Sequence, residues 1–502
     1  MDFRWLKRLK NGVTGLTVVS SLIISLGESR AAQAQVTEYC QLSSEAIAQK
    51  QAFLRQALQG DRNAQNQYKN LISQHSEQLN RCRHQNWPRE QAIWVRLYPC
   101  DARPGELDKL FDQFVNRGYN RVYVEVFYDG QVLLPASDNQ TPWTSVIRHP
   151  RYSDTDLLAQ AIAKGRERGL KVYAWMFAMN FGYSYTQDPN RQEALARNGH
   201  GQTSVTTNMS ASLAGDVNRV SNEVFIDPYN LRAKQDYYLM VQSILRRRPD
   251  GVLYDYIRYP RGMGSASVAS QVQDLWIYGT ASRQALRDRA LNQKGRELIQ
   301  RFLSRGYITA ADISDLNARF PNEGEPLWQG RSSGSADSRT LEQLRSILQT
   351  ELWQLSVAHA IQGVLDFLSV ATLPAQQQGI PAGAVFFPEA NATVGRGYDS
   401  RLQPWDQFPS DLEWHPMAYG ICGNTSCIID QIQRVLSQAP AGTQTMPVLA
   451  GTWGSPISNR PSLEAQMQAL QRAAPQINSV SHFAFSWQDP QSDRDRKFCY
   501  LQ

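Results

Sequence analysis

The sequence predicts an α/β fold, a (β/α)8 TIM barrel with long insertions in its βα loops and a small helical segment ahead of it. First, strand-like and helix-like segments alternate from residue 91 onward in the 502-residue chain, which is typical of a parallel sheet with right-handed crossovers. Second, there are eight strand candidates, the number that closes a TIM barrel. Third, no glycine-rich phosphate loop follows any of these strands, which disfavours the alternative, an open doubly wound sheet.

Composition supports a large folded core. The chain is 42% hydrophobic and 20% charged, which excludes a disordered or fibrous protein. The strand candidates are short and rich in aromatic and β-branched residues. They span residues 92–99, 121–128, 171–180, 251–257, 384–390, 412–419, 447–453 and 482–488.

Segments with helical periodicity separate most of these strands. The fifth and sixth strands have only a short helix near 404–407 between them, which makes this the weakest link of the predicted barrel. The predicted helices span residues 106–117, 156–168, 232–247, 341–368, 428–436 and 463–473.

Two long insertions follow predicted strands. Residues 181–222 come after the third strand, and a helical insertion at about 262–340 comes after the fourth. Because the βα loops of a barrel all emerge at its C-terminal face, where active sites lie, we expect these insertions to wall or cover a cleft.

The N-terminus has the pattern of a signal peptide, residues 1–34. Four basic residues precede a mostly apolar run at 13–26, and Ala32-Gln33-Ala34 offers a cleavage site. We expect an exported protein, periplasmic or extracellular, with an uncleaved anchor as the alternative. No stretch after the leader approaches about 20 apolar residues, so we expect no stable membrane insertion after cleavage.

A helical segment, residues 35–90, separates the leader from the predicted barrel, residues 91–502. We expect it to form a helical hairpin that packs on the barrel or spaces it, with a binding module as the alternative. Removing the leader lowers the formal charge from +6 to +3, since it holds five basic and two acidic residues. This small excess gives no indication of a nucleic-acid partner.

Six cysteines in an exported chain are expected to form disulfides, because the compartment is oxidising. Fifteen complete pairings are possible. Among them we predict Cys40 with Cys82, Cys422 with Cys427, and Cys100 with Cys499. The cysteines and histidines lack zinc-ligand spacing, so we predict no metal site.

The stretch "DGVLYDYIRYPRG" from Asp250 to Gly262 raises the central question of function. It begins as an apolar strand and ends with Asp255, a carboxylate whose burial without a partner costs several kcal/mol. A salt bridge to Arg258 or a turn cap is the structural explanation, and a place in a site is the functional one.

The other strand ends carry a similar mixture of carboxylates and aromatic rings. Aromatic faces stack on the C–H faces of sugar rings, polar side chains bond the hydroxyls, and a carboxylate pair can cleave the glycosidic bond. We predict Asp255 and Glu389 as catalytic residues. The predicted substrate-binding residues are Trp175, Asn180, Tyr256, Arg258, Tyr259, His415, Tyr419, Trp453 and Trp487.

Several of these residues also have structural interpretations. Glu413 lies early in its strand and is expected to be an ion-pair partner inside the barrel. Glu125 lies similarly deep, where we expect a structural or substrate-orienting role, and His415 could be an ordinary buried histidine. No phosphate cradle or metal-binding carboxylate set is evident, which disfavours phosphoryl transfer. The lack of a Gly-x-Ser-x-Gly elbow disfavours a serine esterase.

The chain from about residue 94 to 490 resembles glycosyl-hydrolase-like family 10, bacterial envelope proteins related to retaining glycosidases. The resemblance lies in "GYNRVYVEVFYDGQVLLPAS", "DLLAQAIAKGRERGLKVYAWMFAMN", "FIDPYNLRAKQDYYLMVQSILRRRPDGVLYDYIRYP" and "DLEWHPMAY". It implies a glycoside hydrolase barrel. The chain departs from the family pattern at Glu125 and Phe127, where an amide and an arginine are expected, and at the single Asp255, where an acidic pair is common.

We therefore predict an exported glycoside hydrolase that cleaves an envelope or extracellular polysaccharide without a cofactor. Asp255 is the predicted nucleophile, held ionised by Arg258, and Glu389 is the predicted acid/base, with its pKa raised by burial. Adjacent strand ends can bring two carboxyls to about 5 Å, as in retaining enzymes, whereas more than about 6.5 Å indicates inversion. The alternatives are a noncatalytic glycan-binding barrel and a scaffold whose N-terminal helices bind an envelope partner.

Overall fold

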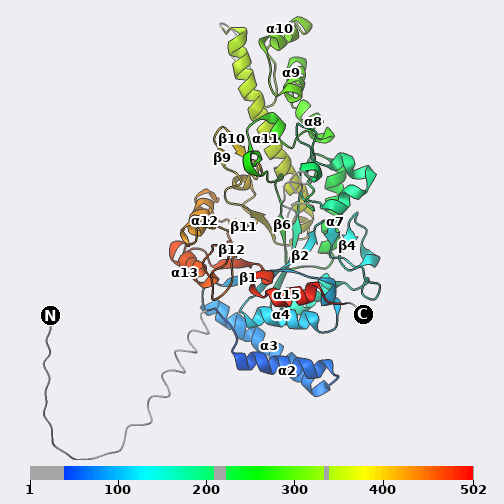
Figure 1. Ribbon diagram of the computed structural model, residues 1–502, viewed down its shortest axis with the longest axis vertical. Coiled ribbons are helices and arrows are strands. Elements are labelled where there is room, and N and C mark those ends of the chain that lie inside the picture. The colour runs from blue at the N-terminus through cyan, green and yellow to red at the C-terminus, as the bar shows by residue number, and fades with distance from the viewer. Residues whose placement is uncertain (1–38, 208–221, 333–338, 501–502) are drawn as a thin grey trace, which may run out of the picture.

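The computed structural model describes residues 39–207, 222–332 and 339–500. The predicted leader, residues 1–34, lies outside the described residues, as do residues 208–221 of the expected insertion at 181–222. Figure 1 shows the barrel in the middle of the molecule, a helical hairpin below it and a group of helices extending above it.

The barrel is closed by parallel strands, and the predicted fold is confirmed. In the described part of the chain the order around the ring is β1, β2, β5, β6, β8, β11, β12, β13 and back to β1. These strands are β1 (Glu90–Arg96), β2 (Arg121–Tyr128), β5 (Lys171–Phe177), β6 (Gly251–Asp255), β8 (Ala382–Phe386), β11 (Glu413–Ala418), β12 (Val448–Ala450) and β13 (Ser479–Phe483).

Continuous apolar runs form these strands because the barrel buries both of their faces. Every residue of β2 is buried, since one face meets the barrel interior and the other meets the surrounding helices. Inside the ring, the Trp94 side chain packs edge-on against Tyr123 and Trp175, with ring centroids 4.7 and 4.8 Å apart. The interior is thus filled with side chains, as expected of a TIM barrel.

Helices surround the ring close to the predicted positions. They are α4 (Glu106–Asn116), α5 (Leu157–Glu167), α7 (Leu231–Leu245), α11 (Leu341–Gln377), α12 (Ser426–Gln438) and α13 (Leu463–Ala473), followed by α14 (Phe485–Gln488) and α15 (Pro490–Lys497). Short 3-10 helices lie at Pro99–Ala102, Ala136–Asp138, Tyr183–Gln187, Pro189–Ala194, Gly264–Ser267, Val272–Asp274 and Trp405–Gln407.

The predicted eighth strand, 482–488, is wrong in its bounds, since it overlaps β13 only at residues 482 and 483. Strand β13 pairs with β1 through Ile93 and His482 and ends at Phe483. The chain then turns into α14, which places the Phe485 ring in the core against Phe114, with centroids 5.4 Å apart. An apolar run continues through both elements, so its hydrophobic character does not reveal where the strand ends.

The insertion after β6 forms α8 (Thr280–Arg287), α9 (Gln293–Arg305) and α10 (Ala310–Arg319), which extend with the first half of α11 away from the barrel (Figure 1). A small antiparallel sheet of β7 (Val268–Ala269), β10 (Gly397–Asp399) and β9 (Thr393–Val394) joins the loop after β6 to the loop after β8. Two further short strands, β3 (Gln131–Val132) and β4 (Thr144–Ser145), extend β2 outward.

Helix α11 corrects the expectation that no stretch after the leader is long and apolar enough to cross a membrane. Its 37 residues include a window with a mean hydropathy of 1.3, enough by length and composition to cross a membrane. However, 61% of that window is buried inside the protein. Its buried side chains include Val364, Phe367 and Leu368, and the Phe367 ring meets Tyr237 of α7 at 5.3 Å between centroids. The apolar character of α11 is therefore that of a core helix.

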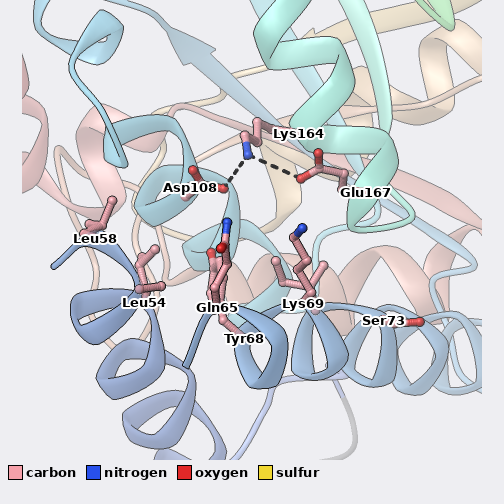
Figure 2. Close-up of a pocket in the computed structure, with 11 residues that line it drawn as sticks. Leu54, Leu58, Gln65, Tyr68, Lys69, Ser73, Asp108, Lys164 and Glu167 are labelled. Atoms are coloured by element: carbon pink, nitrogen blue, oxygen red, sulfur yellow. Dashed lines mark hydrogen bonds and ion pairs between the residues drawn. The ribbon is translucent and has the colours of Figure 1, made fainter. Parts of the chain in front are cut away.

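Helices α2 (Ser44–Leu58) and α3 (Arg62–Gln85) form a hairpin that packs on α4. A buried polar network holds it there, in which the Tyr68 hydroxyl donates to Asp112 at 2.8 Å and Arg168 donates to the same carboxylate at 2.8 Å. Figure 2 shows the adjoining cavity of about 380 Å³, where Lys164 pairs with Asp108 at 3.0 Å. Because Tyr68 of the hairpin and Arg168 of the barrel bond the same buried carboxylate, this network fixes the position of the hairpin on the barrel.

Three disulfides join Cys40 to Cys82, Cys100 to Cys499 and Cys422 to Cys427. All three predicted pairings are confirmed. The first ties the chain entering α2 to α3, and the third closes a short loop before α12. The second joins the segment after β1 to the end of the chain.

Candidate active site

A cleft of about 710 Å³ opens at the C-terminal ends of the barrel strands. Its walls come from seven of the eight strands or from the loops directly after them, together with the loop after β12 and a residue of α12. This is the face on which TIM-barrel active sites are built. Six of the residues predicted to form a site line it: Trp175, Asp255, Tyr256, Arg258, Glu389 and Tyr419.

Aromatic rings form a continuous wall of this cleft. The rings of Tyr256 and Phe177 lie 4.3 Å apart between centroids, and Phe177 lies 6.0 Å from Trp175. Trp175 lies 6.1 Å from Phe483, which lies 5.7 Å from Tyr419. Four strand ends thus present a ring surface, and flat apolar faces beside polar groups suit the alternating C–H and hydroxyl faces of a sugar.

Asp255 is the last residue of β6, and its side chain is 93% buried in the wall of the cleft. One carboxyl oxygen accepts from the backbone N–H of Tyr256 at 2.6 Å, and the other accepts from the indole N–H of Trp175 at 3.3 Å. Burial raises the pKa of Asp255 to about 6, and these bonds and the charge of Arg258 offset only part of that effect. Arg258 lowers the pKa of Asp255 as expected, but burial outweighs that effect and the pKa stays above its ordinary value.

The backbone turns sharply directly after Asp255. Tyr256 has φ of 54°, in the left-handed region that a bulky residue rarely occupies. The position is held on both sides, because its hydroxyl donates to Glu223 at 3.0 Å and its carbonyl accepts from Met179 N–H at 3.2 Å. Strain of about 1 to 3 kcal/mol is found where the surrounding structure over-determines a residue, often at a site. Here the turn aims both Asp255 and Tyr256 at the cleft.

Glu389 lies on the loop directly after β8, the neighbour of β6 in the ring. Its side chain is 47% exposed, and one oxygen lies 3.5 Å from the guanidinium of Arg401. The other accepts from the Gln431 amide at 3.4 Å. The burial expected around Glu389 is not present. The two catalytic candidates therefore sit in opposite environments, with Asp255 buried and Glu389 open to solvent beside a cation.

Glu125 of β2 also lines the cleft, whereas it was predicted to lie deep inside the barrel. Its carboxylate binds the guanidinium of Arg96 across the β1–β2 pair, while its other oxygen is buried without a hydrogen-bond partner. Burial raises the pKa of Glu125, and the neighbouring charges of Asp129 and Asp255 add to that rise. The position of Glu125 in the cleft lining suits the substrate-orienting role, one of the two roles predicted for it.

Asn180 and Tyr259 lie outside the cleft lining. The Asn180 side chain is fully buried, and its oxygen accepts from the backbone N–H groups of Gly182 and Val224. Tyr259 is fully buried too, and its hydroxyl donates to the carbonyl of Ala360 in α11 at 3.2 Å. Both side chains brace the loops around the cleft.

His415 lies inside the barrel, also away from the cleft lining. Its ring is fully buried, 5.6 Å from Tyr123 between centroids, and its Nε2 lies 3.3 Å from Glu413. Burial lowers the pKa of His415. Glu413 pairs with Arg121 at 2.6 Å, as predicted for an interior ion pair. The alternative reading of His415 as a buried structural histidine fits its position better than the predicted sugar contact.

The predicted tryptophans Trp453 and Trp487 are also outside the lining. The Trp453 indole N–H donates to the Tyr119 hydroxyl at 3.3 Å. Trp487 belongs to α14 and meets the guanidinium of Arg460 at 5.6 Å. Trp487 therefore supports a residue of the cleft rim without itself lining the cleft.

The sequence reasoning missed several lining residues, namely Arg96, Phe177, Arg261, Phe387, Met417, Gly420, Ile421, Gln431, Arg460 and Phe483. The signal for Phe177 was available, since it lies two residues after Trp175 on the same face of β5. Arg460 and Gln431 carry no comparable signal, because they reach the cleft from a loop and a helix. Among the described residues, no cluster of three or more His, Cys, Asp or Glu side chains could hold a metal ion.

Comparison with known proteins agrees with this geometry. Residues 83–299 match the model of the family Glycosyl hydrolase-like 10. The predicted family resemblance is confirmed over these residues. The matched glycosyl hydrolase-like 10 region contains β1, β2, β5 and β6, and with them Glu125, Trp175 and Asp255. The lining of the cleft extends beyond the matched residues, to Glu389 and Phe483 among others. A comparison with curated proteins gives no match.

Solved structures of similar shape include the PgaB (BpsB) glycoside hydrolase domain from Bordetella bronchiseptica, at 13% identity and a TM-score of 0.46, over 82% of this chain and 99% of that one. A GH18 chitinase from Pseudoalteromonas aurantia has 10% identity and a TM-score of 0.35, over 79% and 94%. A glycoside hydrolase family 20 beta-N-acetylglucosaminidase has 8% identity and a TM-score of 0.36, over 79% and 64%.

Proposed function

We propose that the protein is an exported glycoside hydrolase that cleaves an envelope or extracellular polysaccharide, with Asp255 as the proton donor. The observation that carries this proposal is Asp255 itself, a buried carboxyl in the cleft wall whose pKa is raised to about 6. A general acid must hold a proton near its working pH, and burial of a carboxyl is how glycosidases achieve this. The predicted roles of Asp255 and Glu389 are thereby exchanged.

Glu389 is the proposed partner. Its carboxylate lies 3.5 Å from the guanidinium of Arg401 in the loop beside the cleft. In the first step, Asp255 donates its proton to the glycosidic oxygen while Glu389 attacks the anomeric carbon, so that the leaving sugar departs as an alcohol. In the second step, water attacks the glycosyl–Glu389 ester, Asp255 takes the water proton, and Glu389 leaves. This is the retaining sequence with a covalent intermediate.

Export and an envelope substrate are supported by the three disulfides, which are typical of oxidising compartments. The aromatic wall supports an extended sugar ligand, because its rings follow one another around four strand ends. These features alone would also serve the alternative, a noncatalytic glycan-binding barrel. The acid with a raised pKa favours the enzyme.

The test is turnover of polysaccharide pools by the purified protein, read as new reducing ends. We expect Glu389→Gln to lower turnover about 100-fold, since the amide cannot attack the anomeric carbon. The anomeric configuration of the first product, read by NMR, is expected to equal that of the substrate. An inverted product would instead make Glu389 a base that activates water.

Glu125→Gln is the matched variant, because it also removes a cleft carboxylate. We expect a smaller loss with Glu125→Gln than with Glu389→Gln. A larger loss with Glu125→Gln would transfer the partner role to Glu125. If wild type binds a glycan and releases no reducing ends from any pool, the binding protein replaces the enzyme as the conclusion.

A further inference from the structure

Four arginines line the cleft, and only one of them pairs with a carboxylate among the described residues. Arg96 pairs with Glu125, but Arg258, Arg261 and Arg460 have no carboxylate within 4.0 Å among the residues that the structure describes. Arginine keeps its charge at any ordinary pH. Three cations without an ion-pair partner therefore meet at one cleft.

Arg258 gives the strongest indication of an anionic ligand, because its side chain is 94% buried. It donates one hydrogen bond, from Nη1 to the carbonyl of Tyr259 at 3.0 Å. Its guanidinium lies over the rings of Tyr256 at 4.5 Å and Phe387 at 5.8 Å. Stacking on rings holds the plane of the guanidinium still and leaves its remaining N–H groups for another acceptor.

The carboxylates of the cleft do not supply that acceptor. Glu125 is taken by Arg96, and the cation next to Glu389 is Arg401, which lies outside the lining. Asp255 accepts from Tyr256 and Trp175 and makes no ion pair with Arg258. Arg258 lowers the pKa of Asp255 through its charge but makes no direct ion pair, so an anionic ligand would give the guanidinium a direct counter-ion.

The other two arginines extend the positive field along the cleft. Arg460 donates from Nε to the carbonyl of Tyr419 at 3.3 Å, which fixes the side chain at the rim. Arg261 is exposed three residues after Arg258. The lining holds four arginines and three carboxylates, and this positive balance favours a ligand of negative charge.

We propose that the glycan bound in this cleft is acidic, with a carboxylate or sulfate on a sugar ring that pairs with Arg258. Arg261 and Arg460 contact further anionic groups along the chain. The inference rests on the proposed function for its glycan but not for its catalysis. Planar guanidinium binds a carboxylate or sulfate through two parallel hydrogen bonds, which a sugar hydroxyl cannot match.

The test is calorimetric binding of three oligosaccharides of equal length to the whole protein: an oligouronate, a sulfated neutral sugar and the unsubstituted neutral sugar. We expect one of the two acidic ligands to bind at least tenfold tighter than the neutral ligand, with an affinity that falls as salt rises. The tighter of the two identifies the anionic group.

Arg258→Met keeps much of the side-chain volume and removes the charge. We expect it to weaken the acidic ligand by tenfold or more and the neutral ligand by less than threefold. Arg472→Met on α13, an exposed arginine outside the cleft lining, is the control and should change neither. Should Arg258→Met fail to fold, Arg261→Met at the exposed rim is expected to weaken the acidic ligand a few-fold.

Equal affinity for neutral and acidic ligands, or equal weakening of both by Arg258→Met, would overturn the acidic substrate. The outcome is separate from that of the proposed function. Cleavage of neutral glycans with no preference for acidic ones would reject this inference alone. Binding of an acidic ligand without cleavage would reject the hydrolase alone.

Discussion

Replacing Asp255 with Asn is expected to lower glycan hydrolysis by about 1,000-fold, within the usual range for loss of a general acid. The amide keeps the size of the side chain and can still accept from the Tyr256 N–H. It cannot give a proton to the glycosidic oxygen. The measurement is the initial rate of reducing-end release at pH 5, with circular dichroism to show that the fold is kept.

Asp227→Asn is the matched control. Asp227 is also fully buried, and burial raises its pKa to about 6, yet it lies outside the cleft lining and binds the backbone N–H groups of Tyr229 and Ser282. We expect this variant to stay active. Comparable losses in the two variants would mean that the effect is general damage to the fold, and Asp255 would lose its assigned role.

Activity is expected to decline tenfold for each pH unit above about 6, reaching about 100-fold by pH 8, because only protonated Asp255 can act as the acid. The pKa near 6 comes first from burial, offset in part by the Tyr256 N–H and Arg258. The profile of kcat/KM against pH reports this group in the free enzyme. A rate that stays flat from pH 5 to 8 would contradict the assignment.

The same raised pKa predicts a change in stability. The ordinary pKa of Asp255 is 3.8 and the folded value is about 6, so the folded state favours the protonated form. This contribution is fully present below pH 3.8 and is lost as pH rises through 6, a change of about 3 kcal/mol in unfolding free energy. Urea unfolding at pH 4 and pH 7 measures it.

The Asp255→Asn variant lacks this titration. We expect its unfolding free energy, relative to wild type, to rise by about 2 kcal/mol between pH 4 and pH 7. Asp227→Asn should show a similar relative rise, because the two carboxyls have similar raised pKa values. Together the two variants separate burial of a carboxyl, which they share, from catalysis, which only Asp255 performs. A constant difference for Asp255→Asn would show that its pKa is unperturbed.

Much of the barrel could be predicted because each strand is buried on both faces and so forms an apolar run. Strand β2 matches its predicted range 121–128 at both ends, and helix α13 matches 463–473. The end of β13 could not be predicted in this way. Phe483 and Phe485 are both core residues, one in a strand and one in a helix, and burial does not distinguish between the two.

The candidate site was predictable where a polar residue interrupts a buried strand end, as at Asp255, and where an aromatic residue lies close to such an end, as at Trp175. It was not predictable where the position of a residue along its strand decides whether its side chain faces the barrel interior or the cleft. His415 and Tyr419 belong to one strand segment, yet the first faces the barrel interior and the second lines the cleft. Arg460 reaches the cleft from a loop that follows β12, and no periodicity in the sequence marks that approach.

The disulfide between Cys100 and Cys499 affects the order in which the parts of the chain can fold. β1 is completed by pairing with β13, and the disulfide that secures this seam joins Cys100 to Cys499, with a sequence separation of 399 residues. A nascent chain therefore cannot close the ring until β13 has emerged. Until then β1 has an open edge toward the missing β13, of the kind that pairs with other chains. Truncation before β13 should thus yield aggregates rather than a smaller stable barrel.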